Sequence, residues 1–145
     1  MKINRIDHIG ITVSDIEAAK QFFVDLGLEL VGEDVVQGEL VDRIIGLENV
    51  KSKVAMLRIP DGNVDIELSE FLTPASVDGS EGALVNARGI RHLCFAVEDL
   101  DGLVAKMTTR GATLVGEVVN YENFYKLCYL HGPEGILLEL AEKLN

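Results

Sequence analysis

Four side chains of types that bind metal ions occur at matching places in two similar stretches of this 145-residue sequence. His8 and His92 each lie near the start of a strand-like run that opens one stretch. Glu67 and Glu139 each lie inside an apolar run near the end of the same stretch. A carboxylate inside an apolar strand is costly unless it has a partner. Two imidazoles and two carboxylates form a suitable ligand set for a divalent cation that keeps positions open for water or substrate.

The two stretches are copies of one unit. Residues 6–33 align with residues 90–117 without a gap, and nine of the 28 aligned positions are identical. Average amino-acid usage would give about two identities by chance. A second match pairs VDIELSE (64–70) with ILLELAE (136–142). Both histidines and both glutamates fall on equivalent positions of the repeat, which favours one common metal site over four unrelated side chains.

Each copy predicts the element order β-α-β-β-β. Alternating, β-branched residues indicate a strand over residues 6–13. The pattern Ser14-x-x-Glu17 is typical of a capping box, and apolar residues at helical spacing predict a helix that Gly27 ends. In the second copy Gly111 is expected to end the helix. The later strands are expected at 54–59 and 64–68 in the first copy and at 125–130 and 136–140 in the second.

The sequence therefore predicts an α+β fold built from two tandem βαβββ modules in one domain that spans residues 1–145. The first module covers about 4–72, the linker 73–89, and the second module about 90–143. The helices are expected to pack on one face of each sheet and to leave the other face free. The first copy also carries 12 extra residues after its Gly-Glu. Their apolar residues predict a short amphipathic turn, which is either a lid or wall over a cavity or a plain surface loop.

The composition excludes several classes of partner. Thirteen Lys and Arg against 24 Asp and Glu give a formal net charge of −11, so we expect no nucleic-acid partner and no anionic membrane surface. No apolar run approaches the roughly 20 residues that span a bilayer, and the N-terminal residues do not resemble a signal peptide. Cys94 and Cys128 lie in apolar runs and are expected as small buried side chains. The cytoplasm is the simplest expected location.

The sequence resembles the vicinal oxygen chelate superfamily, which includes glyoxalase I, methylmalonyl-CoA epimerase, extradiol dioxygenases and bleomycin-resistance proteins. The segments that carry the resemblance are DHIGITVSDIEAAKQFFVDLGLELVGE, VDIEL, RHLCFAVEDLDGLVAKMTTRGATLVGE and GPEGILLELAE. The resemblance implies a cup-shaped mixed sheet with helices on its outer face, around a divalent metal ion such as Ni, Co, Zn, Mn or Mg. The implied ligands are His8, Glu67, His92 and Glu139. This set is similar to that of glyoxalase I and close to that of the epimerase.

The resemblance implies a metal-dependent lyase or isomerase that abstracts a proton next to a carbonyl of a small substrate. The metal would stabilise the resulting enediolate, and Glu139 or Glu67 would act as general base. One alternative is epimerase-like activity, for which Glu48 is a candidate second base or simply a solvated loop residue. Another is a non-catalytic binding or resistance protein on the same fold. A homodimer is expected, with the site formed within one chain or across two.

The residue types do not identify the substrate. Coenzyme A or glutathione would need basic anchors, and strand alternation predicts a partly apolar cavity wall suited to a small carbonyl compound. The candidate anchors are Arg5, Arg43, Lys51, Lys53, Arg58, Arg88 and Arg91. The expected wall residues are Met56, Asp65, Tyr125, Leu127 and Tyr129. His131 has no counterpart in the repeat and is expected to be structural.

Overall fold

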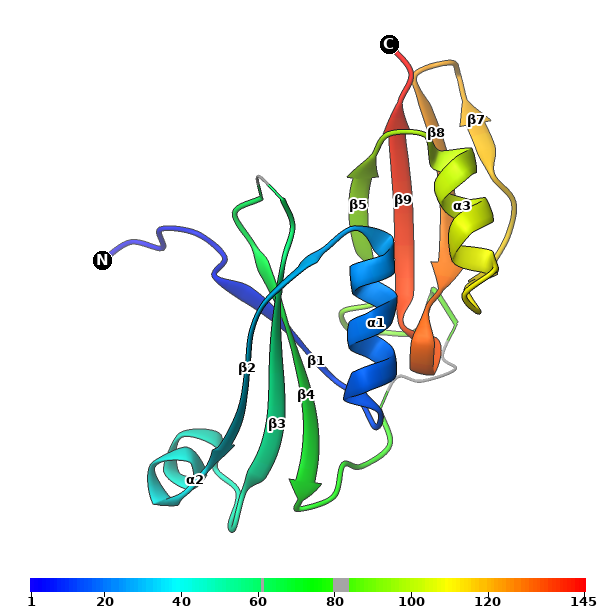
Figure 1. The fold of residues 1–145 in the computed structure, drawn as a ribbon. Coiled ribbons are helices and arrows are strands. Elements are labelled where there is room, and N and C mark those ends of the chain that lie inside the picture. Colours follow the sequence, from blue (N-terminus) through cyan, green and yellow to red (C-terminus); the bar gives the residue numbers. More distant parts are fainter. Residues whose placement is uncertain (61, 80–83) are drawn as a thin grey trace. The chain divides into compact units, whose positions relative to one another are not determined.

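The computed structural model describes residues 1–60, 62–79 and 84–145 of the chain (Figure 1). The chain divides into two compact units, Met1–Val77 and Asp78–Asn145. Residues 80–83 of the predicted linker lie outside the described residues. No helix among the described residues has the length and apolar character needed to cross a membrane.

The first unit contains one four-stranded sheet. Its elements are β1 (His8–Thr12), α1 (Ile16–Leu26), β2 (Glu29–Gln37), α2 (Glu39–Ile45), β3 (Lys51–Arg58) and β4 (Asp65–Thr73). The strand order is β1-β4-β3-β2, with β1 parallel to β4 and the other neighbours antiparallel. This arrangement confirms the predicted βαβββ order, with α2 inserted between the second and third strands.

The second unit repeats this plan. Its elements are β5 (Leu93–Val97), α3 (Leu100–Thr108), β6 (Thr113–Leu114), β7 (Val119–Tyr121), β8 (Tyr125–His131), a 3₁₀ turn (Pro133–Gly135) and β9 (Leu137–Lys143). The strand order is β5-β9-β8-β6, and β7 also pairs with β8. Again the first and last strands, β5 and β9, are parallel. The mixed α+β fold with two βαβββ units is therefore confirmed.

Each helix packs its apolar stripe on one face of its own sheet. In α1 the buried residues include Ile16, Ala19 and Phe23, and the helix contacts β3 and β4 (Figure 1). Gly27 ends α1 as predicted, at a φ of 124° that favours glycine, and its N–H donates to the carbonyl of Phe23. In the second unit α3 packs on β9 but ends at Thr108, three residues before the predicted Gly111.

The N-terminus of α1 does not use the predicted capping box. The residue that caps α1 is Asp15, one position after Ser14, and its carboxylate accepts from the N–H of Ala18. A second carboxylate from the last strand also caps each helix. Glu70 accepts from the N–H of Ile16 at 3.0 Å, and its repeat counterpart in β9 does the same for α3. Neither role is visible in the local sequence, because the glutamate lies more than 40 residues from the helix that it caps.

Replacing Glu142 with alanine is expected to lower the free energy of unfolding by about 0.5–2 kcal/mol, the usual value of a lost N-cap. The carboxylate of Glu142 accepts from the N–H of Leu100 at 2.8 Å, and this buried start of α3 would lose an acceptor. Urea denaturation measures the change. Glu98→Ala, at an exposed position beside the same helix, is the control and should change stability by less than about 0.5 kcal/mol. Equal effects of both variants would contradict the capping role.

The extra residues of the first unit form α2 at the end of β2 (Figure 1). None of its residues is buried, and the apolar side chains of Leu40 and Ile44 are largely exposed. The predicted helical turn is therefore present. Whether it covers a cavity stays a prediction.

Candidate functional site

His8 and Glu67, the first pair, lie on adjacent parallel strands of the first sheet. His8 is the first residue of β1, and the residue two positions later, Gly10, pairs with Glu67 of β4. Since side chains two residues apart point to the same face of a strand, the register places both functional side chains on one face. The His8 Nε2 and Glu67 Oε2 atoms are 3.8 Å apart.

His92 and Glu139, the second pair, reproduce this geometry in the second sheet. His92 directly precedes β5, and Cys94, two positions later, pairs with Glu139 of β9. The His92 Nε2 and Glu139 Oε2 atoms are 3.2 Å apart. Both pairs therefore arise from the same register between the first and last strands of a unit.

Strand alternation explains why these glutamates do not enter the core. On either side of Glu67, Ile66 and Leu68 are buried on the face that α1 covers. Leu138 and Leu140 flank Glu139 in the same way. The glutamates therefore lie on the opposite face of each sheet and stay partly accessible, with 29% and 18% of their side-chain surface exposed. A glutamate can therefore lie within an apolar stretch of sequence without entering the core, because alternate residues of a strand face opposite sides of the sheet.

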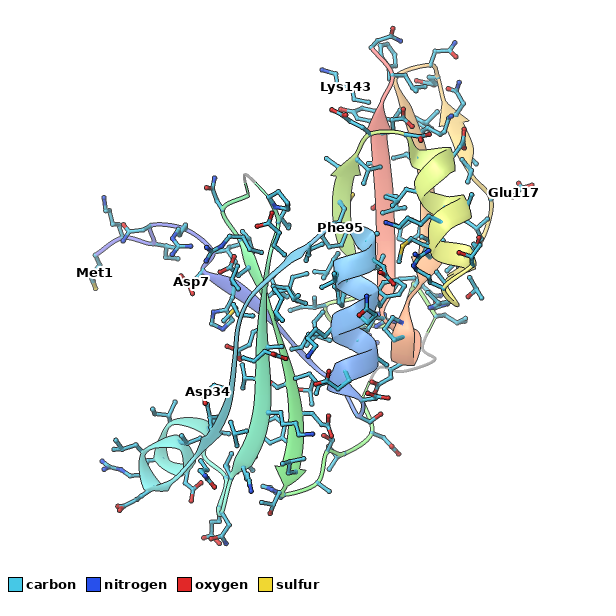
Figure 2. The ribbon with its side chains drawn as sticks, in the orientation of Figure 1. Met1, Asp7, Asp34, Phe95, Glu117 and Lys143 are labelled. Carbon is cyan, nitrogen blue, oxygen red and sulfur yellow. The ribbon has the colours of Figure 1, made fainter. Side chains whose placement is uncertain are left out.

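His8 is held by a carboxylate on its other ring nitrogen. The Nδ1 atom donates to Asp7 at 3.0 Å, and Asp7 also pairs with Arg5 at 2.6 Å. Asp7 lies at the N-terminal end of β1 (Figure 2). The hydrogen bond to Asp7 raises the pKa of His8 above its ordinary value, with a smaller contribution from the charge of Glu67. A hydrogen bond at Nδ1 leaves Nε2 to face Glu67, as is usual for a metal-binding histidine with a carboxylate behind it.

Glu139 has two further neighbours in addition to His92. Tyr129 lies opposite Glu139 in the β8–β9 pair, and its ring meets the His92 imidazole edge to face at 5.2 Å. Cys94 is the residue of β5 that pairs with Glu139. Burial, and then the nearby charge of Glu139, raise the pKa of the Cys94 thiol and that of the Tyr129 hydroxyl.

The predicted burial of the two cysteines is correct only for Cys128. Cys94 keeps an exposed surface, because it lies on the same face of β5 as the second pair, whereas Cys128 is buried. In the sequence, the position of Cys94 two residues after His92 indicates that both side chains lie on one face of the strand. The apolar run around Cys94 nevertheless favours a core residue.

A pocket of about 460 Å³ adjoins the second pair. His92, Glu139 and Tyr129 contribute its polar surface, together with Glu117. The apolar lining comes from Val85, Val115, Val119 and Leu127. Of the expected wall residues, Leu127 and Tyr129 line this pocket. Its volume lies at the small end of the usual range for ligand sites, about 300–1,000 Å³.

The structure does not bring the other candidate residues to these pairs. Glu48 lies before Lys51, the first residue of β3, whereas Met56 is the residue opposite Glu67. At a rise of about 3.3 Å per residue, Lys51 is already about 16 Å along β3 from Met56. Within the first unit, Glu48 is therefore too far along the sheet to act beside Glu67.

The remaining candidates are not among the described residues that line the pocket with the second pair. His131 ends β8, where it pairs with Leu137 and Thr113. Arg5 and Arg58 form ion pairs with Asp7 and Asp65. In the part of the chain that the structure describes, no lysine or arginine lines the pocket.

The pair geometry fits a divalent cation. Two ligand atoms bound to one cation at about 2.1 Å, at angles of 90 to 109°, lie about 3.0 to 3.4 Å apart. The second pair falls in this range at 3.2 Å, and the first lies slightly outside it at 3.8 Å. Among residues 1–60, 62–79 and 84–145 no group of three or more His, Cys, Asp or Glu forms a metal-binding cluster. Each pair thus supplies two ligands of a suitable type.

A family model and a solved structure point to one family. The model of the Glyoxalase/Bleomycin resistance protein/Dioxygenase superfamily matches residues 5–140. A glyoxalase family protein of Bacillus cereus, whose crystal structure is known, is 46% identical, with a TM-score of 0.97 over 100% of this chain and 97% of that one. The uncharacterized protein YwbC of Bacillus subtilis is 28% identical over 96% of this chain and 98% of its own length. The uncharacterized protein YaeR of Escherichia coli is also 28% identical, over 97% and 98%.

Proposed function

Because the chain belongs to the Glyoxalase/Bleomycin resistance protein/Dioxygenase superfamily, we propose that it is a metal-dependent lyase or isomerase. The reaction would begin with removal of a proton next to a carbonyl of a small substrate. The observation that carries the proposal is the repetition of one His–Glu pair, in the same strand register, in both units. Each pair lies on the face of its sheet opposite to the helix and is partly exposed, where a ligand can reach it.

In this proposal both pairs hold one divalent cation, within one chain or across a dimer. A bound cation would stabilise the negative charge that develops on the oxygens of the substrate. The imidazoles of His8 and His92 act through Nε2. One of the two carboxylates, Glu67 or Glu139, accepts the proton from the substrate carbon.

The pocket beside the second pair supports a small and largely apolar substrate. Its four apolar lining residues would contact the alkyl or aryl part of the substrate, while His92 and Glu139 lie at the reacting end. The described lining carries two carboxylates and neither lysine nor arginine. A substrate with a large anionic carrier, such as coenzyme A, would therefore need to place that carrier outside this pocket. This favours a glyoxalase-like reaction on a compact compound over the epimerase-like alternative.

A non-catalytic protein that binds a small molecule is the second candidate. The same pocket would serve it, since fold and cavity do not decide turnover. The two candidates differ in what the protein does to its ligand. An assay of the metal-loaded protein against hemithioacetals, methylmalonyl-CoA and catechols separates them. Binding without turnover of any of them would favour the second candidate.

Protein soaked in Ni²⁺, Zn²⁺ or Mn²⁺ and then desalted is expected to retain about one equivalent of metal per site. Metal content is measured by plasma emission spectrometry. The variant with both His8→Ala and His92→Ala loses one ligand of each pair and should retain less than about 0.1 equivalent. The variant His131→Ala is the control, because this imidazole ends β8 outside the pairs. Retention below about 0.1 equivalent by the unmodified protein would overturn the metal proposal.

We also propose a cytoplasmic homodimer, as expected from the sequence. Light scattering coupled to size-exclusion chromatography tests the dimer directly, and a mass of 15.8 kDa would mean a monomer. The dimer matters to the site because ligands from two chains could then meet at one cation.

A further inference from the structure

The pocket of the second unit is lined by a carboxylate that the proposed reaction does not use. Glu117 lies on the loop between β6 and β7 (Figure 2) and lines the pocket together with His92 and Glu139. Within residues 1–60, 62–79 and 84–145, no side chain forms an ion pair or a hydrogen bond with Glu117. A carboxylate accepts hydrogen bonds and donates none, so the complementary group of a ligand is a cation or another donor.

The equivalent carboxylate of the first unit has a cation beside it. Residue 33 aligns with residue 117 in the repeat, and Glu33 pairs with Lys20 of α1 at 2.5 Å. The position equivalent to Lys20 in the second unit holds Val104, which is buried in α3. The repeat therefore keeps the carboxylate in both units, but the described part of the second unit supplies no cation for it.

Backbone hydrogen bonds hold the loop that carries Glu117 against β8. The N–H of Val115 donates to the carbonyl of Tyr129 at 3.0 Å, and Val119 of β7 pairs with Leu127. Glu117 lies between these two attachments, so its backbone has a defined place beside β8. The side chains of Val115, Val119 and Leu127 give the pocket an apolar surface next to Glu117.

Glu139 lies on the other side of β8, where it is opposite Tyr129. Since neighbouring strands are about 4.8 Å apart, two strand spacings, or about 10 Å, separate the backbones of Glu117 and Glu139. A ligand whose reacting end meets the pair of His92 and Glu139 would therefore place its opposite end beside Glu117. Glu117 is exposed, so a charged end group at this place keeps part of its hydration.

We propose that Glu117 determines substrate specificity by selecting small carbonyl compounds that carry an ammonium group at the end remote from the carbonyl. The inference rests on the proposed function, which places the substrate in this pocket, and it names the substrate class that the proposed function leaves open. Glu117 takes no part in the proton transfer, because it lies about two strand spacings from the pair. A substrate with an anionic end group would meet a like charge at Glu117 and bind more weakly.

The first test measures the binding of hexylamine, hexanol and hexanoate to the metal-free full chain by NMR titration. These probes share one alkyl chain and differ in the charge of the end group. Hexylamine is expected to bind at least about 5-fold more tightly than hexanol, and hexanoate more weakly than hexanol. Equal binding of the three probes, or no measurable binding of hexylamine, would overturn the inference.

The second test removes or reverses the charge of Glu117. Glu117→Gln should abolish the preference for hexylamine and keep the affinity for hexanol within about twofold. Glu117→Lys should bind hexanoate more tightly than hexylamine. The side chain is exposed, so neither substitution is expected to disturb folding. A Glu117→Lys variant that still prefers hexylamine would contradict the assignment.

Glu33→Gln is the matched control, because Glu33 holds the equivalent position of the repeat and already pairs with Lys20. This variant should keep the preference for hexylamine within about twofold. If Glu33→Gln lowers the preference as much as Glu117→Gln does, the effect comes from the net charge of the protein, and the inference is wrong.

Glu139 is the other carboxylate of the described lining, so a third variant tests whether the amine binds there. Glu139→Gln should keep the preference for hexylamine within about twofold, because this carboxylate already faces the His92 imidazole at 3.2 Å. A preference that is lost in Glu139→Gln but kept in Glu117→Gln would place the ammonium group at the pair and overturn the inference. Failure of the proposed function looks different, because the unmodified protein would then retain no metal while its preference for hexylamine, measured without metal, would persist.

Discussion

Replacement of Glu139 by alanine is expected to lower kcat/KM by at least about 10³-fold on the substrate that the metal-loaded protein turns over. The substitution removes a proposed metal ligand, which is also the ion-pair partner of His92. The His92 imidazole, which packs on the Tyr129 ring, loses the carboxylate that lies 3.2 Å from its Nε2 atom. Steady-state kinetics on metal-reconstituted protein measures the loss.

The control must remove a carboxylate without touching either pair. Glu98→Ala serves here, since Glu98 lies between β5 and α3 at an exposed position, and it should keep kcat/KM within about twofold. Circular dichroism shows whether both variants fold. A folded Glu139→Ala variant with unchanged turnover would exclude Glu139 as ligand and as base.

Replacement of Phe23 by alanine is expected to lower the free energy of unfolding by about 3–5 kcal/mol. Phe23 is fully buried in α1 and meets the Phe22 ring edge to face at 5.6 Å. Its removal leaves a cavity between the helix and the sheet, because the close-packed side chains around it relax only partly into the space. Urea denaturation followed by far-ultraviolet circular dichroism measures the change.

The neighbouring Val24 provides the control for this stability prediction. It is 39% exposed on the other side of α1, so Val24→Ala should change stability by about 0.5 kcal/mol or less. A loss below about 1 kcal/mol for Phe23→Ala would mean that the α1 stripe is not the main contact of the first sheet. Met107 occupies the equivalent position of the repeat and is also fully buried, so Met107→Ala should cost about 2–5 kcal/mol in the second unit.

The sequence alone was sufficient for the element order of each unit. The period of apolar residues is a local property, and the repeat doubled the signal by showing the same pattern twice. The same two copies also identified His8, His92, Glu67 and Glu139 as candidates, since a costly glutamate in an apolar strand recurs at the equivalent position. The sequence predicts the ends of helices less accurately than their presence, since α3 ends at Thr108 rather than at Gly111.

Local patterns failed where a distant residue decides the outcome. Ser14 matched a capping pattern, but Asp15 caps α1 and Glu70 adds a second acceptor from a strand 54 residues away. The apolar neighbours of Cys94 in the sequence predict a core residue, but Cys94 is exposed. Its surroundings depend on which residue of β9 it pairs with.

What the sequence determined by itself is therefore the repeat, the element order and the chemical types of the candidate ligands. The tertiary structure alone decided which histidine meets which glutamate, because the register between β1 and β4 joins residues 59 positions apart through backbone hydrogen bonds. It also decided that Tyr129 and Cys94 lie beside Glu139, whereas Met56 and Gly10 hold the equivalent positions beside Glu67. Hydrogen bonds between strands depend on register, and register follows from the burial of whole strand faces rather than from any single residue.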